Sequence, residues 1–115
     1  MNAFLQVTTA AHSRDAASEL ARSAVASRLA ACAQVIGPVE SVYWHLGEMG
    51  DGEEWQVLLK TTAARYPALE AHLLAQHPWK NPEVTAIALE AGSASYLNWI
   101  SASVSSVESV PEAEM

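Results

Sequence analysis

The chain has 115 residues, half of them hydrophobic and 17% charged, which leaves room for one globular domain with a single core. Six Lys and Arg residues against 13 Asp and Glu give a formal net charge of −7, which weighs against nucleic-acid binding. No apolar run is long enough to cross a membrane, and the N-terminus lacks the features of a signal peptide, so we expect no membrane association and a cytoplasmic location.

The first part of the chain predicts a strand followed by an amphipathic helix. Residues 3–9 (AFLQVTT) alternate and contain β-favouring residue types. Ser13 can act as an N-cap, and Asp15 in the first turn suits the helix dipole. Apolar residues then recur at helical spacing and form one buried stripe: Ala17, Leu20, Ala21, Ala24, Val25 and Leu29.

The middle of the chain predicts a long β-hairpin. Its first strand has two different faces, with Val42, Trp44 and Leu46 on one and Ser41, Tyr43 and His45 on the other. Gly37-Pro38 predicts a bend or bulge near the start of this strand. The glycine cluster Gly47–Gly52 predicts the turn, and residues 54–61 (EWQVLLKT) predict the return strand. A hairpin of this length should extend beyond the body of a small domain and need a partner.

A second helix follows the hairpin. Pro67 suits its first turn, and Leu69, Leu73 and His77 fall at i, i+4 and i+8, so His77 continues a core-facing row. Pro78 ends this helix near His77, because the residue before a proline avoids the α region. We expect His72 to face solvent.

The remaining residues predict a strand, a short helix and a tail. Residues 83–90 (EVTAIALE) have strand character, and a short helix follows that carries Tyr96, Leu97, Trp99 and Ile100. Residues 105–115 form an acidic tail rich in Ser and Val, for which we expect a short strand or disorder, outside a domain that we place at residues 1–104.

The order β-α-β-β-α-β with a terminal helix predicts an α+β protein with the ferredoxin-like split βαβ arrangement. Two crossover helices on one side of a four-stranded sheet leave the other face uncovered. We expect Trp44 and Trp55 to lie on that face, which would make it too apolar to be exposed in a monomer. Association through this face, or through the hairpin, is the expected outcome.

Three stretches carry a resemblance to a known family: RLAACAQVIGPVESVYWHLG, then VLLKT, then HPWKNPEVTAIALEAGSASYLNWI. Together they resemble the CutA family, the divalent-cation tolerance proteins, from about residue 5 to about residue 104. The resemblance implies trimers of ferredoxin-like subunits packed sheet to sheet, similar to the PII signalling proteins. It also implies a non-enzymatic role in tolerance of, or response to, divalent metal ions such as copper.

The chain departs from the family pattern at three places. Trp79-Lys80 follows the HP pair where the family usually has Tyr-Glu or Tyr-Gln. Some members have a copper-ligating cysteine at the end of the first strand, where this chain reads Val7-Thr8-Thr9. Some also have a second histidine where this chain has Gln76. His77 is therefore the only residue of this chain that matches a ligand of such a copper site.

Three residues are candidate metal ligands. His77 and Glu83 flank the two prolines of the QHPWKNPE stretch, and imidazole with a carboxylate suits copper, zinc or nickel. The alternative for His77 is a helix-terminal residue that packs beside Leu73 and interacts with the last carbonyls of the helix. Cys32 is a possible thiolate ligand, or a small buried apolar residue after the helix. No cofactor is obligatory on this interpretation, and Cu²⁺ is the cation that we expect.

Three further residues are candidates for a ligand cleft between subunits. Lys60 lies among apolar strand residues and could bind a small anion; the alternatives are an ion pair with Glu83 or Glu53, or an extended stem that reaches solvent. Trp44 and Trp79 could form the walls of such a cleft, or belong to the core or an interface.

Two functional hypotheses follow. The first is a cytoplasmic, trimeric CutA-like protein that acts through assembly and metal binding. The second is a PII-like signalling module that binds a small anion at subunit clefts. The sequence contains no nucleophile elbow, phosphate-binding glycine loop or HExxH motif, so we expect no enzymatic activity.

Overall fold

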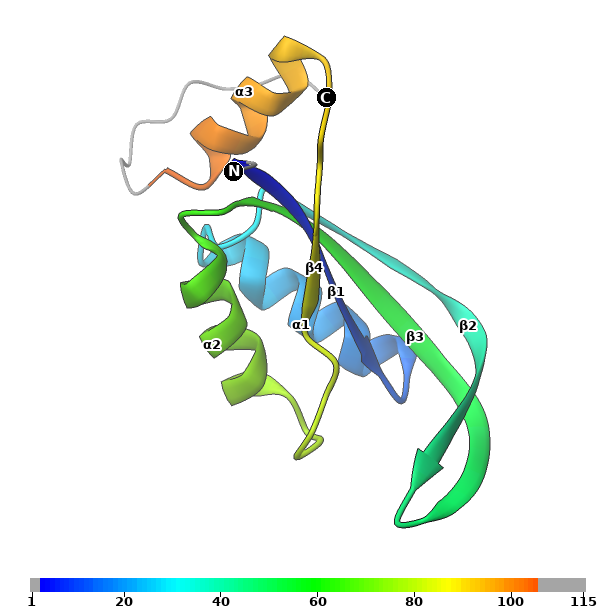
Figure 1. Cartoon of the computed structure of the whole chain (residues 1–115). Helices are drawn as coiled ribbons and strands as arrows, with labels where there is room; N and C mark the ends of the chain where they lie inside the picture. The colour runs from blue at the N-terminus through cyan, green and yellow to red at the C-terminus, as the bar shows by residue number, and fades with distance from the viewer. Residues whose placement is uncertain (1–2, 106–115) are drawn as a thin grey trace.

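The structure, a computed structural model, describes residues 3–105 as one four-stranded antiparallel sheet with three helices (Figure 1). The elements, in chain order, are β1 (Phe4–Ala11), α1 (Arg14–Ala26), β2 (Cys32–His45), β3 (Glu48–Thr62), α2 (Tyr66–Gln76), β4 (Thr85–Ala88) and α3 (Ala94–Ser103). The strand order β2-β3-β1-β4 and the βαββαβ succession confirm the predicted ferredoxin-like α+β fold. The predicted tail lies outside the described residues except for Ser105, so the domain boundary stays a prediction.

Helices α1 and α2 cover one face of the sheet and bury the core (Figure 1). Ser13 caps α1 as predicted, because its Oγ accepts a hydrogen bond of 3.1 Å from the amide of Ala16. The helix ends at Ala26, before the last residue of its predicted stripe. The residues that fill the core are Val7, Ala11, Ala17, Leu20, Ala21, Ala24, Leu29, Ala30, Val57, Leu59, Leu69 and Leu73.

The opposite face of the sheet presents the residues that alternate with the core positions. On β1 and β3 these are half-buried, and on β2 and β4 they are exposed: Gln6, Thr8, Leu58 and Lys60, then Gln34, Ile36, Thr85 and Ile87. This pattern agrees with the uncovered face that the sequence predicts. We call it the open face.

The hairpin is longer than predicted and turns at a different place. Its ladder continues to the pair His45–Glu48, so the turn consists of Leu46 and Gly47 alone, with φ of 53° and 81°. A two-residue turn of this kind requires positive φ at both positions. The predicted turn over residues 47–52 is therefore wrong: the rest of the glycine cluster lies in β3. There, a Cβ on Gly50 would lie 3.1 Å from the ring of Tyr43, its cross-strand partner.

The predicted irregularity at Gly37-Pro38 is confirmed as a register shift between Ile36 and Val39. Gly37 packs against the ring of Trp55, and a Cβ at Gly37 would lie 2.6 Å from two ring carbons. Trp55 pairs with Ala11 and packs against the core, so its predicted place on the uncovered face is wrong. The guanidinium of Arg14 lies 5.9 Å from the centre of the same ring.

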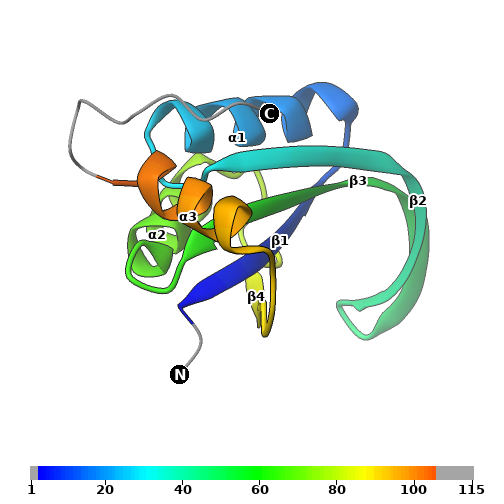
Figure 2. The same ribbon diagram turned by 90° about the horizontal axis from the view of Figure 1, so that it is seen from above.

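Beyond Trp55 the hairpin leaves the body. Figure 2 shows it curving away from α1, and the molecule measures 48 × 26 × 24 Å. Trp44 pairs with Met49, which alternation places on the same side of β3 as Trp55, and not on the open face as predicted. We call the part of the hairpin from Glu40 to Glu53 the hairpin tip.

Candidate functional site

His77 closes the corner between α2 and β4. It is 8% exposed, and its Nε2 lies 2.6 Å from the carbonyl oxygen of Ala10 at the end of β1. Its Nδ1 accepts a hydrogen bond of 3.0 Å from the backbone N–H of Trp79. Because Nδ1 accepts, the ring proton belongs on Nε2, which donates to Ala10. Both ring nitrogens therefore have partners inside the protein.

This arrangement confirms one part of the prediction and refines another. His77 does continue the buried row of Leu69 and Leu73, and its backbone N–H donates to the carbonyl of Leu73. Its ring, however, bonds to β1 and to the following loop, whereas the sequence suggested the last carbonyls of its own helix. The corner thereby ties three segments together: the end of α2, the end of β1 and the approach to β4.

The two tryptophans of the predicted cleft lie in different surroundings. Trp79 is half-buried beside His77, with ring centroids 5.1 Å apart and planes tilted by 43°. Trp44 lies in the hairpin tip and is 77% exposed. Trp79 thus belongs to the corner and Trp44 to the hairpin tip.

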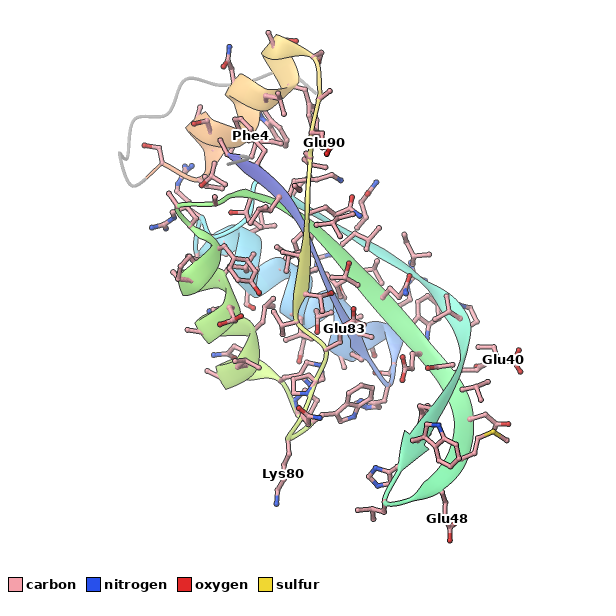
Figure 3. The ribbon with its side chains drawn as sticks, viewed as in Figure 1. Phe4, Glu40, Glu48, Lys80, Glu83 and Glu90 are labelled. Atoms are coloured by element: carbon pink, nitrogen blue, oxygen red, sulfur yellow. The ribbon has the colours of Figure 1, made fainter. Side chains whose placement is uncertain are left out.

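Glu83 and Cys32 have neighbours of their own. A carboxylate oxygen of Glu83 accepts a hydrogen bond of 2.7 Å from the hydroxyl of Thr85. Figure 3 shows Glu83 beside the sheet, whereas Lys80 projects away from the body. Cys32 begins β2, is half-buried, and its Sγ lies 3.7 Å from the hydroxyl of Tyr96 in α3.

The three predicted metal ligands therefore occupy three separate places. Among residues 3–105, no group of three or more His, Cys, Asp or Glu side chains is arranged to hold a metal ion. A tight divalent site needs three or four ligands in a preset geometry. The described part of the chain does not supply such a set.

Lys60 lies on the open face, between Gln6 of β1 and Cys32 of β2 in the sheet register. Neither predicted ion pair forms. Alternation along β3 places Glu53 on the opposite side of the strand, and Glu83 is hydrogen-bonded to its own neighbour. Within the described residues, the ammonium group of Lys60 has no carboxylate partner.

Two contacts at these sites were not predicted from the sequence. The Tyr96 hydroxyl meets Cys32, and burial together with this contact raises the pKa of Tyr96. His72 was expected to face solvent but is half-buried, with Nε2 2.9 Å from the Ser23 hydroxyl. That hydroxyl donates to the carbonyl of Leu20, so it accepts from His72 and is not activated as a nucleophile. On a helical wheel, Ser23 lies beside the buried stripe of α1, and this position could have indicated that it contacts a neighbouring helix.

Comparisons with known proteins agree on one family. The model of the CutA1 divalent ion tolerance protein family matches residues 5–103. The chain is 34% identical over 88 residues to the divalent-cation tolerance protein CutA of Thermus thermophilus, covering 76% of this chain and 85% of that protein. It is also 34% identical over 87 residues to a chloroplastic CutA 1 of rice, where the match covers 76% of this chain but only 49% of the longer rice protein.

Solved structures give the same result. A rice CutA1 crystal structure superposes with a TM-score of 0.87 at 30% identity, covering 92% of this chain and 97% of that one. A structure described as the periplasmic divalent cation tolerance protein CutA from Archaeoglobus fulgidus superposes with a TM-score of 0.85 at 25% identity. The match covers 89% of this chain and 99% of that one. Sequence and fold together show that the chain belongs to the CutA1 divalent ion tolerance protein family.

Proposed function

We propose that this protein is a homotrimer that supports tolerance of divalent cations, with copper as the expected cation, by assembly and binding and not by catalysis. Membership of the family and the names of its relatives support the link to divalent cations. The proposal of a trimer rests on the trimers that the family resemblance implies and on the surface of the chain.

The observation that carries the assembly is the hairpin tip. Its large apolar side chains have no core to enter in their own subunit: Val42 is 60% exposed, Trp44 77%, Leu46 90% and Met49 71%. Monomeric soluble proteins rarely expose a contiguous apolar patch of this kind. A second copy of the chain is the partner that is always present, so burial between copies accounts for these residues.

Light scattering at micromolar concentration tests the assembly, with a trimer mass expected. Trp44→Glu should shift the mass towards the monomer, because a carboxylate would be buried in the interface. Leu74→Glu is the matched control, since Leu74 is an exposed apolar residue of α2. The melting temperature of the wild type should also rise with protein concentration. A wild-type protein that scatters as a monomer would defeat the proposal.

For the cation, we propose weak binding. His77 can coordinate a metal ion only by giving up one of its two hydrogen bonds, and the described residues of one subunit offer no group of three ligands. Calorimetric titration of Cu(II) into the wild type and His77→Ala, at neutral and mildly acidic pH, tests this. We expect weak binding at neutral pH that becomes weaker at mildly acidic pH, because protons compete with the metal ion for its ligands, and that is lost in the variant. Nanomolar binding that survives the substitution would place the ligands elsewhere.

The compartment stays a prediction. No helix among the described residues is long and apolar enough to span a membrane. Relatives are named as chloroplastic in one case and periplasmic in another. The cytoplasmic location that we propose rests on the sequence alone.

A further inference from the structure

Two polar side chains, Gln6 and Cys32, flank Lys60 where the open face meets α3, and Tyr96 of α3 contacts Cys32. In the register of the sheet, Lys60 stands directly between Gln6 and Cys32. Directly opposed side chains on one face of a sheet have Cβ atoms about 4.5–5.5 Å apart. From α3, the hydroxyl of Tyr96 reaches within 3.7 Å of the Cys32 Sγ. Figure 1 shows α3 lying at this end of the sheet.

The surroundings of this cluster are apolar. Leu58 lies on the same face two residues before Lys60, and Ile87 of β4 pairs with Gln6 and is 61% exposed. If the open face is covered in the proposed trimer, Lys60 is covered with it, and in this respect the inference rests on the proposed function. A buried ammonium group without a counter-charge is strongly unfavourable.

The described part of the chain does not provide that counter-charge. The carboxylate of Glu83 is bonded to Thr85, and Glu53 lies on the other side of β3. When the open face is covered, Lys60 therefore needs a negative group from outside residues 3–105 of its own chain.

The cluster is rich in hydrogen-bond donors. Lys60 offers three N–H groups, Gln6 an amide NH₂, and Tyr96 a hydroxyl. Burial and the contact with Cys32 raise the pKa of Tyr96, so its hydroxyl keeps its proton at neutral pH. A cation beside neutral donors is the arrangement that suits an oxyanion.

We propose that Lys60, Gln6 and Tyr96 form a binding site for a small free oxyanion of the phosphate or carboxylate class, at the boundary between subunits. The anion neutralises Lys60 when the open face is covered. Its occupancy then couples ligand concentration to the stability of the assembly.

Inorganic phosphate is the probe, titrated calorimetrically into the wild type, Lys60→Gln, Tyr96→Phe and Lys80→Gln at constant ionic strength. Loss of the ammonium group should lower the affinity by about tenfold or more, since charged hydrogen bonds are the strong ones. Tyr96→Phe keeps the ring and removes the hydroxyl, so it should lower the phosphate affinity by a smaller factor. Lys80→Gln removes an equal charge from an exposed position outside the site and should leave the affinity unchanged.

Light scattering on the same samples separates this inference from the proposed function. A wild-type trimer that takes up no phosphate would overturn the anion site and leave the trimer standing. A trimer that ignores phosphate but melts at lower temperature after Lys60→Gln would show that a carboxylate of another copy supplies the charge, which also overturns the free oxyanion. Equal phosphate affinity in the wild type and Lys60→Gln would place the anion elsewhere.

Discussion

The two ends of the β2–β3 ladder have the same backbone pairing and opposite surroundings. At the base, Val57 and Leu59 are fully buried under the helices. At the tip, Val42 and Trp44 are mostly exposed, although the pairing continues to the last residues before the turn. Backbone hydrogen bonds therefore shape the whole hairpin, but among residues 3–105 only its base contributes to a core.

The change from buried to exposed side chains along the hairpin is abrupt. Strand β1 stops at Ala11, opposite Trp55, so the sheet beyond that pair has only β2 and β3. The bulge at Gly37 lies against the ring of Trp55 at the same level. Two further contacts fix this boundary: the His77 ring on Ala10, and the Arg14 guanidinium beside the Trp55 ring.

The largest effect is expected from a change at the base. Leu59→Ala should lower the free energy of unfolding by about 2–5 kcal/mol, because it leaves a cavity in a fully buried position. Leu46→Ala at the tip should cost less, because its side chain is 90% exposed within its own chain and loses only contacts between copies. Urea denaturation measures both. Equal costs would mean that a partner buries the tip as thoroughly as the helices bury the base.

At the boundary, Gly37→Ala should cost about 1–3 kcal/mol, because the added methyl group would lie too close to the Trp55 ring. Gly47→Ala separates this clash from backbone strain. Gly47 has φ of +81°, and a methyl group added there would meet no atom of the described residues within 4 Å, so only about 1–2 kcal/mol of strain is expected. The midpoints of urea denaturation measure both costs, provided that the m-value stays unchanged. A neutral Gly37→Ala would show that Trp55 moves aside without cost.

The His77 contacts should also be measurable as stability. His77→Ala leaves the Ala10 carbonyl and the Trp79 N–H without partners, at an expected cost of about 1–3 kcal/mol. Amide hydrogen exchange at Trp79 should accelerate. His12→Ala, at an exposed position, is the control and should change neither quantity. Unchanged exchange at Trp79 would contradict the assigned role of the imidazole.

The smallest effect concerns two buried threonines of the base. The hydroxyl of Thr9 is buried and has no hydrogen-bond partner among residues 3–105, whereas that of Thr61 donates to the carbonyl of Leu29 at 2.7 Å. Thr9→Val should therefore stabilise the protein by up to about 1 kcal/mol, and Thr61→Val should destabilise it by a similar amount. Thermal denaturation of the two variants tests whether each substitution raises or lowers the stability. Destabilisation by Thr9→Val would indicate a partner for its hydroxyl, such as a bound water.

Much of the fold could be predicted from the sequence because local patterns agree with the packing. The Ser13 cap, the buried row of Leu69, Leu73 and His77, and the bulge at Gly37-Pro38 each follow from spacing or backbone chemistry. The position of the turn did not follow, because Leu46 adopts positive φ and no propensity of leucine indicates it.

The candidate site was less predictable, because its contacts join segments far apart in the sequence. Nothing in the corner motif indicates that His77 binds Ala10, or that Tyr96 meets Cys32. Trp55 was assigned to the wrong face, since alternation within one strand does not say which face the helices cover. Register and helix placement, not residue type, decide these contacts.

The two-residue turn at Leu46–Gly47 also bears on the order of folding. A loop this short closes with little loss of chain entropy, so β2 and β3 can pair before any distant contact forms. Strands β1 and β4, in contrast, come from opposite ends of the fold and can pair only after the intervening chain has been brought together. The hairpin thus offers a template on which β1 can dock, and a mutation that weakens the turn should slow folding more than it speeds unfolding.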